Sequence, residues 1–66
     1  MDKDQAQAKL SEMIQSLDGM PPNMKGKTNL KRMLIASLKF IQQYQIDEKT
    51  IRLIIEEREK NYKDIV

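Results

Sequence analysis

The chain has 66 residues, a formal net charge of +2, and neither cysteine nor histidine. This length fits one domain near the lower limit for independent folding, where a single core rarely supplies more than about 3–5 kcal/mol. Without cysteine and histidine the chain lacks the side chains of disulfides, of most zinc sites and of the usual catalytic dyads. We therefore expect neither an enzyme nor a cofactor or metal site.

Hydropathy predicts no association with membranes. No apolar run approaches the ~20 residues of a membrane span, and the first 20 residues lack the apolar middle of a signal peptide. These features favour a soluble, cytoplasmic protein.

The charges are segregated along the chain. The segment from Gly19 to Ile46 has no acidic residue, and all ten acids lie outside it. Such asymmetry is typical of a surface that meets an anionic partner, nucleic acid or an acidic protein. The candidate contact residues are the five bases of this segment: Lys25, Lys27, Lys31, Arg32 and Lys39.

The first predicted helix covers about residues 4–18. Apolar residues recur there at helical spacing and form a one-sided stripe: Ala6, Leu10, Met13, Ile14 and Leu17. Asp2 or Asp4 can cap its start, and Gln7 would complete a capping box with Asp4. Gly19 fits the left-handed position past the helix end, and the two prolines that follow stop the helix.

A loop at 19–27 precedes a second helix at about 29–45, which Thr28 or Asn29 would cap. Its apolar residues span a wide arc, which predicts contact with two neighbours and a place at the centre of the core. They are Leu30, Met33, Leu34, Leu38, Phe40, Ile41 and Tyr44. With Phe40, Tyr44 and Tyr62 all on the core side, no platform is left for stacking single-stranded bases.

A third helix is predicted at about 48–63, with Asp47 as its cap and Ile46 packing on Ile51 as a hydrophobic staple. Its buried stripe comprises Ile51, Ile54, Ile55, Tyr62 and Ile65. Arg58 falls within this stripe. We expect it to extend past the apolar surface or to meet a carboxylate.

These elements predict an all-α fold, a single domain of residues 1–66 with three helices. Helices two and three would form a tight hairpin resembling a helix-turn-helix, and helix one would pack across it. A symmetric dimer of that hairpin is the structural alternative. Ile41 and Gln45 occupy places where the DNA-reading motif usually has a small residue and glycine, so sequence-specific reading is not favoured.

Gly26-Lys27-Thr28 is similar to the end of a phosphate-binding loop. The loop motif has four residues between its glycines, whereas six separate Gly19 from Gly26, and no strand precedes them. Nucleotide hydrolysis is therefore not expected. A simple phosphate contact at the helix start needs no sheet and stays open.

The favoured function is a small non-enzymatic accessory or regulatory protein that contacts nucleic acid backbone weakly through the basic segment and assists a larger machine. The alternative is a protein-binding adaptor or homodimeric helical module without nucleic-acid contact. Ile35 and Leu53, each off the apolar arc of its helix, would then belong to the protein interface, with Met20 and Met24 as adaptable contacts.

Overall fold

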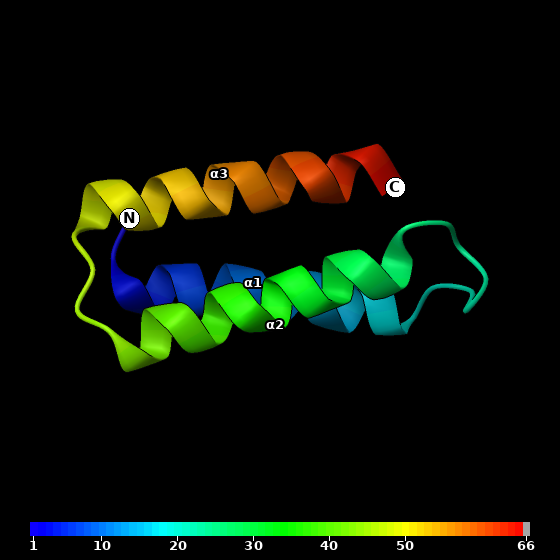
Figure 1. The fold of residues 1–66 in the computed structure, drawn as a ribbon, viewed down its shortest axis with the longest axis horizontal. Coiled ribbons are helices and arrows are strands. Elements are labelled where there is room, and N and C mark those ends of the chain that lie inside the picture. The colour runs from blue at the N-terminus through cyan, green and yellow to red at the C-terminus, as the bar shows by residue number, and fades with distance from the viewer. Residues whose placement is uncertain (66) are drawn as a thin grey trace.

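The computed structural model describes residues 1–65 and consists of three helices, α1 (Lys3–Asp18), α2 (Lys27–Gln43) and α3 (Glu48–Ile65). Consecutive helices run in opposite directions along the long axis of an elongated body of 36 × 18 × 16 Å (Figure 1). The predicted all-α, three-helix fold with a packed α2–α3 pair is confirmed.

Helix α1 begins with a capping box. The Asp2 carboxylate accepts a hydrogen bond from the Gln5 backbone N–H at 2.8 Å, and the Gln5 side chain accepts one from the Asp2 N–H at 3.2 Å. Asp2 is thus the cap, rather than Asp4. Two otherwise unpaired backbone donors are satisfied, which fixes the helix start at Lys3.

The left-handed glycine of the described residues is Gly26, not Gly19 as predicted. Gly19 is right-handed (φ −82°), so its prediction as a left-handed terminator is wrong. Gly26 has φ +81° and precedes α2 directly. The left-handed turn at Gly26 sets the direction of α2, and its carbonyl accepts from the Leu30 N–H.

Helix α2 consequently starts at Lys27, two residues earlier than expected, and it has no side-chain cap. The predicted caps, Thr28 and Asn29, are wrong because both residues already lie inside the first turn. At the other end Tyr44 is extended, and residues 44–47 connect to α3.

Among residues 1–65, nine buried apolar side chains form the core: Ala6, Leu10, Met13, Leu17, Leu30, Leu34, Ile41, Ile51 and Ile55. Four of them come from α1, three from α2 and two from α3. Helix α1 also packs more extensively on α2 than α3 packs on either helix. Helix α2 contacts both neighbours, as predicted, and shares the centre of the core with α1.

Within residues 1–65, no helix is both long enough and apolar enough to cross a bilayer.

Candidate interaction surface

The five predicted basic contact residues do not share one surface. Lys31 forms an ion pair with Asp18 of α1, with Nζ 2.5 Å from Oδ1. Lys27 donates a hydrogen bond to the Met20 carbonyl at 2.8 Å and so ties the start of α2 to the preceding loop. Both cations are engaged within the chain, which reduces the anion site expected at the helix start.

The other three bases are exposed: Lys25 in the loop, and Arg32 and Lys39 on α2. No acid of residues 1–65 pairs with any of them. Arg32 and Lys39 are seven residues apart, so they lie on one side of the helix about 10 Å from each other. We call these two residues the basic ridge.

Hydrogen bonds identify which neighbour each side of α2 faces. Gln42 donates to Gln7 of α1 at 3.5 Å, and the Lys31–Asp18 ion pair also points to α1. On another side, the Ser37 hydroxyl accepts a hydrogen bond from Arg58 Nε of α3 at 3.1 Å. Half-buried Arg58 thus meets a hydroxyl rather than the carboxylate that was one expectation.

The Ser37 side of α2 continues into an exposed apolar stripe. Met33, Phe40 and Tyr44 lie four residues before, three after and seven after Ser37, and they are 39%, 45% and 58% exposed. The Phe40 and Tyr44 rings stack in a tilted arrangement with centroids 5.2 Å apart. The prediction that both aromatic rings point to the core is therefore wrong.

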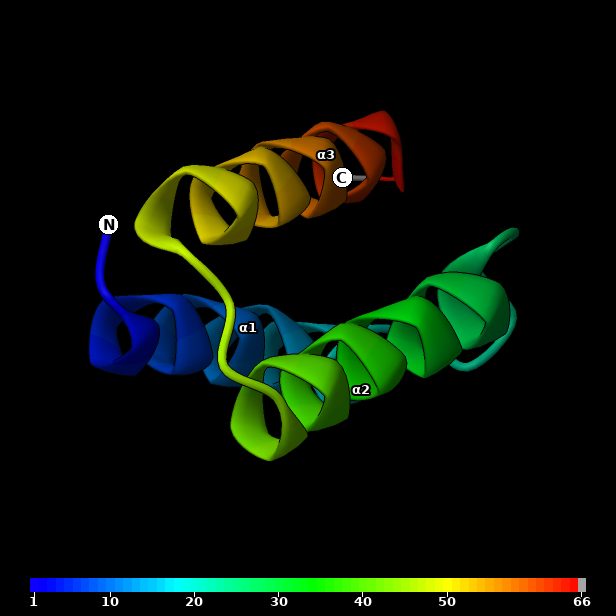
Figure 2. The same ribbon diagram turned by 60° about the vertical axis from the view of Figure 1, so that its left-hand side comes forward.

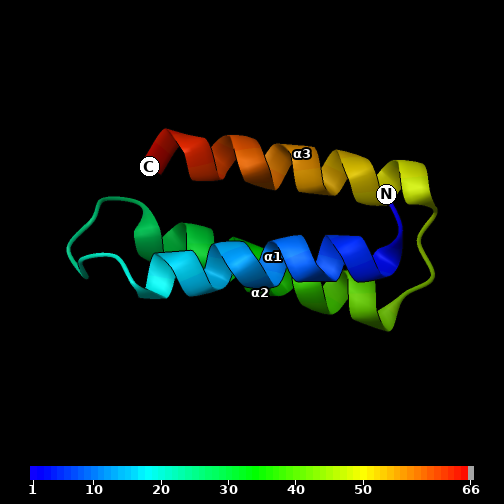
Figure 3. The same cartoon turned by 180° about the vertical axis from the view of Figure 1, so that it is seen from behind.

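The arrangement of the helices explains this exposure. Figure 1 shows α2 and α3 with α1 behind them, and in the view from behind α1 lies in front (Figure 3). The turned view shows α1 and α2 side by side beneath α3 (Figure 2). Helix α1 therefore covers one side of α2, and no described element covers the outer side between α2 and α3.

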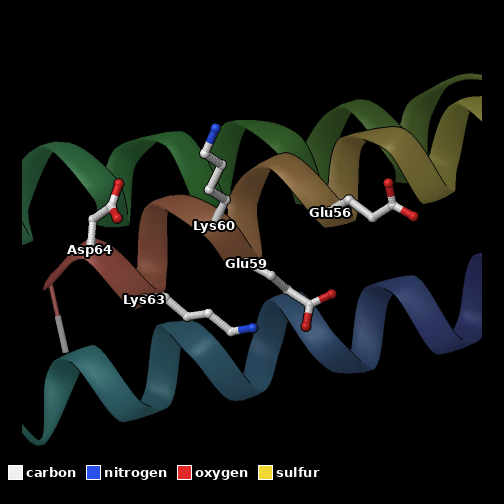
Figure 4. A pocket seen from close by; sticks show the side chains of 5 residues that line it. All are labelled: Glu56, Glu59, Lys60, Lys63 and Asp64. Atoms are coloured by element: carbon white, nitrogen blue, oxygen red, sulfur yellow. The ribbon is translucent and has the colours of Figure 1, made fainter.

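Helix α3 carries a second exposed stripe, on the side turned away from α1. Glu59 pairs with Lys9 of α1 at 3.6 Å, so Glu57, which lies two residues earlier, is turned away from α1. Leu53, 56% exposed, lies one turn before Glu57. Figure 4 shows Lys60 and Asp64 extending to the edge of α3 away from α1.

We define the α2/α3 face by its two stripes: Met33 and Phe40 on α2 with Tyr44 directly after its end, and Leu53, Glu57, Lys60 and Asp64 on α3. Each residue of the basic ridge precedes a stripe residue by one position, Arg32 before Met33 and Lys39 before Phe40, and so lies about 100° around the helix from it. No acid of residues 1–65 pairs with the ridge, and no base pairs with Glu57 or Asp64.

The two predicted interface residues do not come together. Ile35 lies one turn after Lys31 and one before Lys39 and is half-buried on the α1 side of α2. Leu53 lies on α3, on the α2/α3 face. Met20 and Met24 are half-buried in the loop, and Met20 packs against the core.

Comparisons with protein-family models, curated proteins and solved structures found no match. The function is therefore inferred from the residues and geometry of the chain itself.

A shallow hollow of about 370 Å³ lies along α3, lined by Glu56, Glu59, Lys60, Lys63 and Asp64 (Figure 4). Every lining residue is charged and comes from one helix, which is the composition of a solvated surface. No group of acids in the described residues is arranged to hold a metal ion.

Sequence reasoning missed the exposed stripe because it assigned every apolar residue of the second helix to the core. One signal was available in the pattern. Met33, Phe40 and Tyr44 all lie at one edge of the apolar arc, whereas the buried Leu30, Leu34 and Ile41 lie near its middle.

Proposed function

We propose that the protein is a small non-enzymatic interaction module that binds a helical protein surface through the α2/α3 face. The observation that carries this proposal is the exposure of Met33, Phe40 and Tyr44 along three turns of one helix. Exposed large apolar and aromatic side chains on one side of a helix are typical of protein interfaces, which are enriched in tyrosine, phenylalanine and methionine.

The basic ridge defines the chemistry of the partner. Arg32 and Lys39 are exposed on α2, about 100° around the helix from the apolar stripe, and α2 contains no acid. A complementary helix would present an apolar stripe bordered by two acids about two turns apart. Buried contacts would come from the stripe, and the ion pairs at its border would set register and orientation.

Site-specific photo-cross-linking tests this proposal. A benzophenone amino acid replaces Phe40 in one variant and Gln15, exposed on α1, in a control variant. In living cells we expect a defined cross-linked protein product from position 40 and none from position 15. No product at position 40, or equal products at both positions, would contradict the proposal.

A second candidate function is a weak contact with nucleic acid backbone through Lys25, Arg32 and Lys39. It is supported by the absence of acids from Gly19 to Ile46 and by the exposure of these three side chains. Three neutralised phosphates give a modest, salt-dependent affinity, which falls about 40-fold between ~50 and ~200 mM salt.

The two functions compete for the same side chains, because Arg32 and Lys39 cannot pair with a protein carboxylate and a phosphate at once. A gel-shift series compares the natural chain with the triple alanine variant of Lys25, Arg32 and Lys39. Unchanged DNA and RNA binding in the variant would exclude the nucleic-acid function.

A further inference from the structure

We infer that the partner of the α2/α3 face is a second copy of this chain, with α2 of each copy packed against α3 of the other. This inference rests on the proposed function and identifies its partner. The chemistry expected of the partner is an apolar stripe bordered by two acids two turns apart. The chain's own α3 carries Leu53 with Glu57 and Asp64, which are seven residues apart.

The spacing of the acids matches that of the basic ridge, since Arg32 and Lys39 are also seven residues apart. Helices α2 and α3 are antiparallel, and the Arg58–Ser37 hydrogen bond fixes their relative level. Lys39 is two residues after Ser37, and Glu57 is one before Arg58. With a rise of 1.5 Å per residue, Lys39 and Glu57 therefore lie within about 1.5 Å of each other along the direction of the helix axes, which we call their level.

Arg32 and Asp64, the second pair of opposite charges, differ in level by the same amount. Arg32 is five residues before Ser37 and Asp64 is six after Arg58, so this pair also differs by about 1.5 Å in level. In the monomer none of these four side chains forms an ion pair with residues 1–65. Both opposite-charge pairs are thus available for contacts between chains.

A two-fold axis parallel to the helices preserves these levels. It places α2 of each copy over α3 of the other copy, with the two helices antiparallel. Because the interface is isologous, it contains this α2–α3 contact twice. Arg32 would meet Asp64 of the second copy, and Lys39 would meet Glu57. Leu53 lies at the level between Phe40 and Tyr44, where it packs against the two rings.

The size of the face suits a modest dimer. The extents of the whole body, 36 × 18 Å, limit the footprint to about 650 Å² on each copy, at the lower end of specific interfaces. Lys60 opposes association, because it lies in the α3 stripe between Glu57 and Asp64 and approaches the level of the partner's ridge. We therefore expect a reversible dimer in the micromolar range that weakens with salt.

Charge exchange tests the pairing. One variant carries Arg32→Glu with Lys39→Glu, and the other Glu57→Lys with Asp64→Lys. Sedimentation equilibrium should show a loss of affinity of on the order of a hundredfold for each variant alone, because every pair becomes repulsive. A 1:1 mixture should form a heterodimer, since all four contacts then join opposite charges. Circular dichroism checks that each variant stays helical.

Two further variants sharpen the test. Lys60→Glu should tighten the natural dimer, because it removes a like charge. Asp4→Lys with Glu12→Lys changes the net charge as much as the acid-to-lysine variant does, but on exposed positions of α1. It should leave the dimer affinity within a few-fold of the natural value.

Three results would overturn the inference: a natural chain that stays monomeric at millimolar concentration, a dimer that both exchanged variants retain, or variants whose mixture fails to associate. Cross-linking at position 40 separates this failure from that of the proposed function. A monomeric chain that still cross-links there to a different protein keeps its interaction role and loses the second copy as partner.

Discussion

Arg58 Nε donates a hydrogen bond to Ser37 Oγ at 3.1 Å, joining the middle of α3 to the middle of α2. Arg58 is half-buried, and its side chain bridges two helices that pack on each other less extensively than α1 and α2 do. This contact sets the level at which the two helices align.

A double-mutant cycle should detect this bond. We expect Ser37→Ala and Arg58→Met each to destabilise the fold, with a coupling of about 1.5 kcal/mol between them, the lower end of the range for a hydrogen bond to a charged donor. Urea unfolding followed by circular dichroism measures the four stabilities. Additive effects would show that the bond contributes nothing to the packing of α3.

Replacing each glycine with alanine should have opposite results. Gly26 has φ +81°, so alanine there costs about 1–2 kcal/mol through backbone strain. Space is not the cause, because an added Cβ would lie 3.5 Å from Ile65 Cδ1, an ordinary contact. Gly19 is right-handed, and an added Cβ would make only ordinary contacts, 3.6 Å from the Ser16 carbonyl oxygen, so alanine there should stabilise by about 0.4–1 kcal/mol. Equal effects in thermal unfolding would contradict these backbone assignments.

The capping box predicts a difference between two acids near the N-terminus. Asp2→Ala should destabilise the fold by about 1 kcal/mol, because it removes the acceptor of the Gln5 N–H. Asp4→Ala removes only a charge from the first turn and should cost about 0.5 kcal/mol or less. Chemical denaturation of both variants gives the comparison, and a larger loss at Asp4 would move the cap there.

Two leucines test the division between core and surface. Leu34 is fully buried, and Leu34→Ala should cost about 2–5 kcal/mol, enough to unfold most molecules of a domain this small. Leu53 is 56% exposed, and Leu53→Ala should change stability by about 0.5 kcal/mol or less below the association concentration. A strongly destabilised Leu53→Ala monomer would mean that this side chain belongs to the core.

Helical periodicity was sufficient to predict the number of helices and the stripe that α1 buries, because that stripe is narrow and α2 and α3 together cover it. It was insufficient for α2. The width of the apolar arc gives the surface of α2 that can be buried. The positions of α1 and α3 determine which part of that surface is buried. Phe40 and Tyr44 extend beyond the part that the two neighbours cover.

The sequence predicted that a glycine would adopt a left-handed conformation, but not which glycine. One glycine was expected to be left-handed, and one is, but it is Gly26 instead of Gly19. The loop geometry before α2, which includes the Lys27 contact with the Met20 carbonyl, is a tertiary property. The same holds for the basic segment, whose division into engaged and exposed cations depends on where Asp18 lies.

The chain has no tryptophan and two tyrosines, and these occupy different environments. The half-buried Tyr62 hydroxyl shares a hydrogen bond with Ser16 of α1, whereas Tyr44 is exposed beside Phe40. The fluorescence of each tyrosine therefore reports one process: that of Tyr62 reports unfolding, and that of Tyr44 reports binding of a partner to the α2/α3 face. With either one replaced by phenylalanine, the emission of the other follows folding and association separately, without any attached dye.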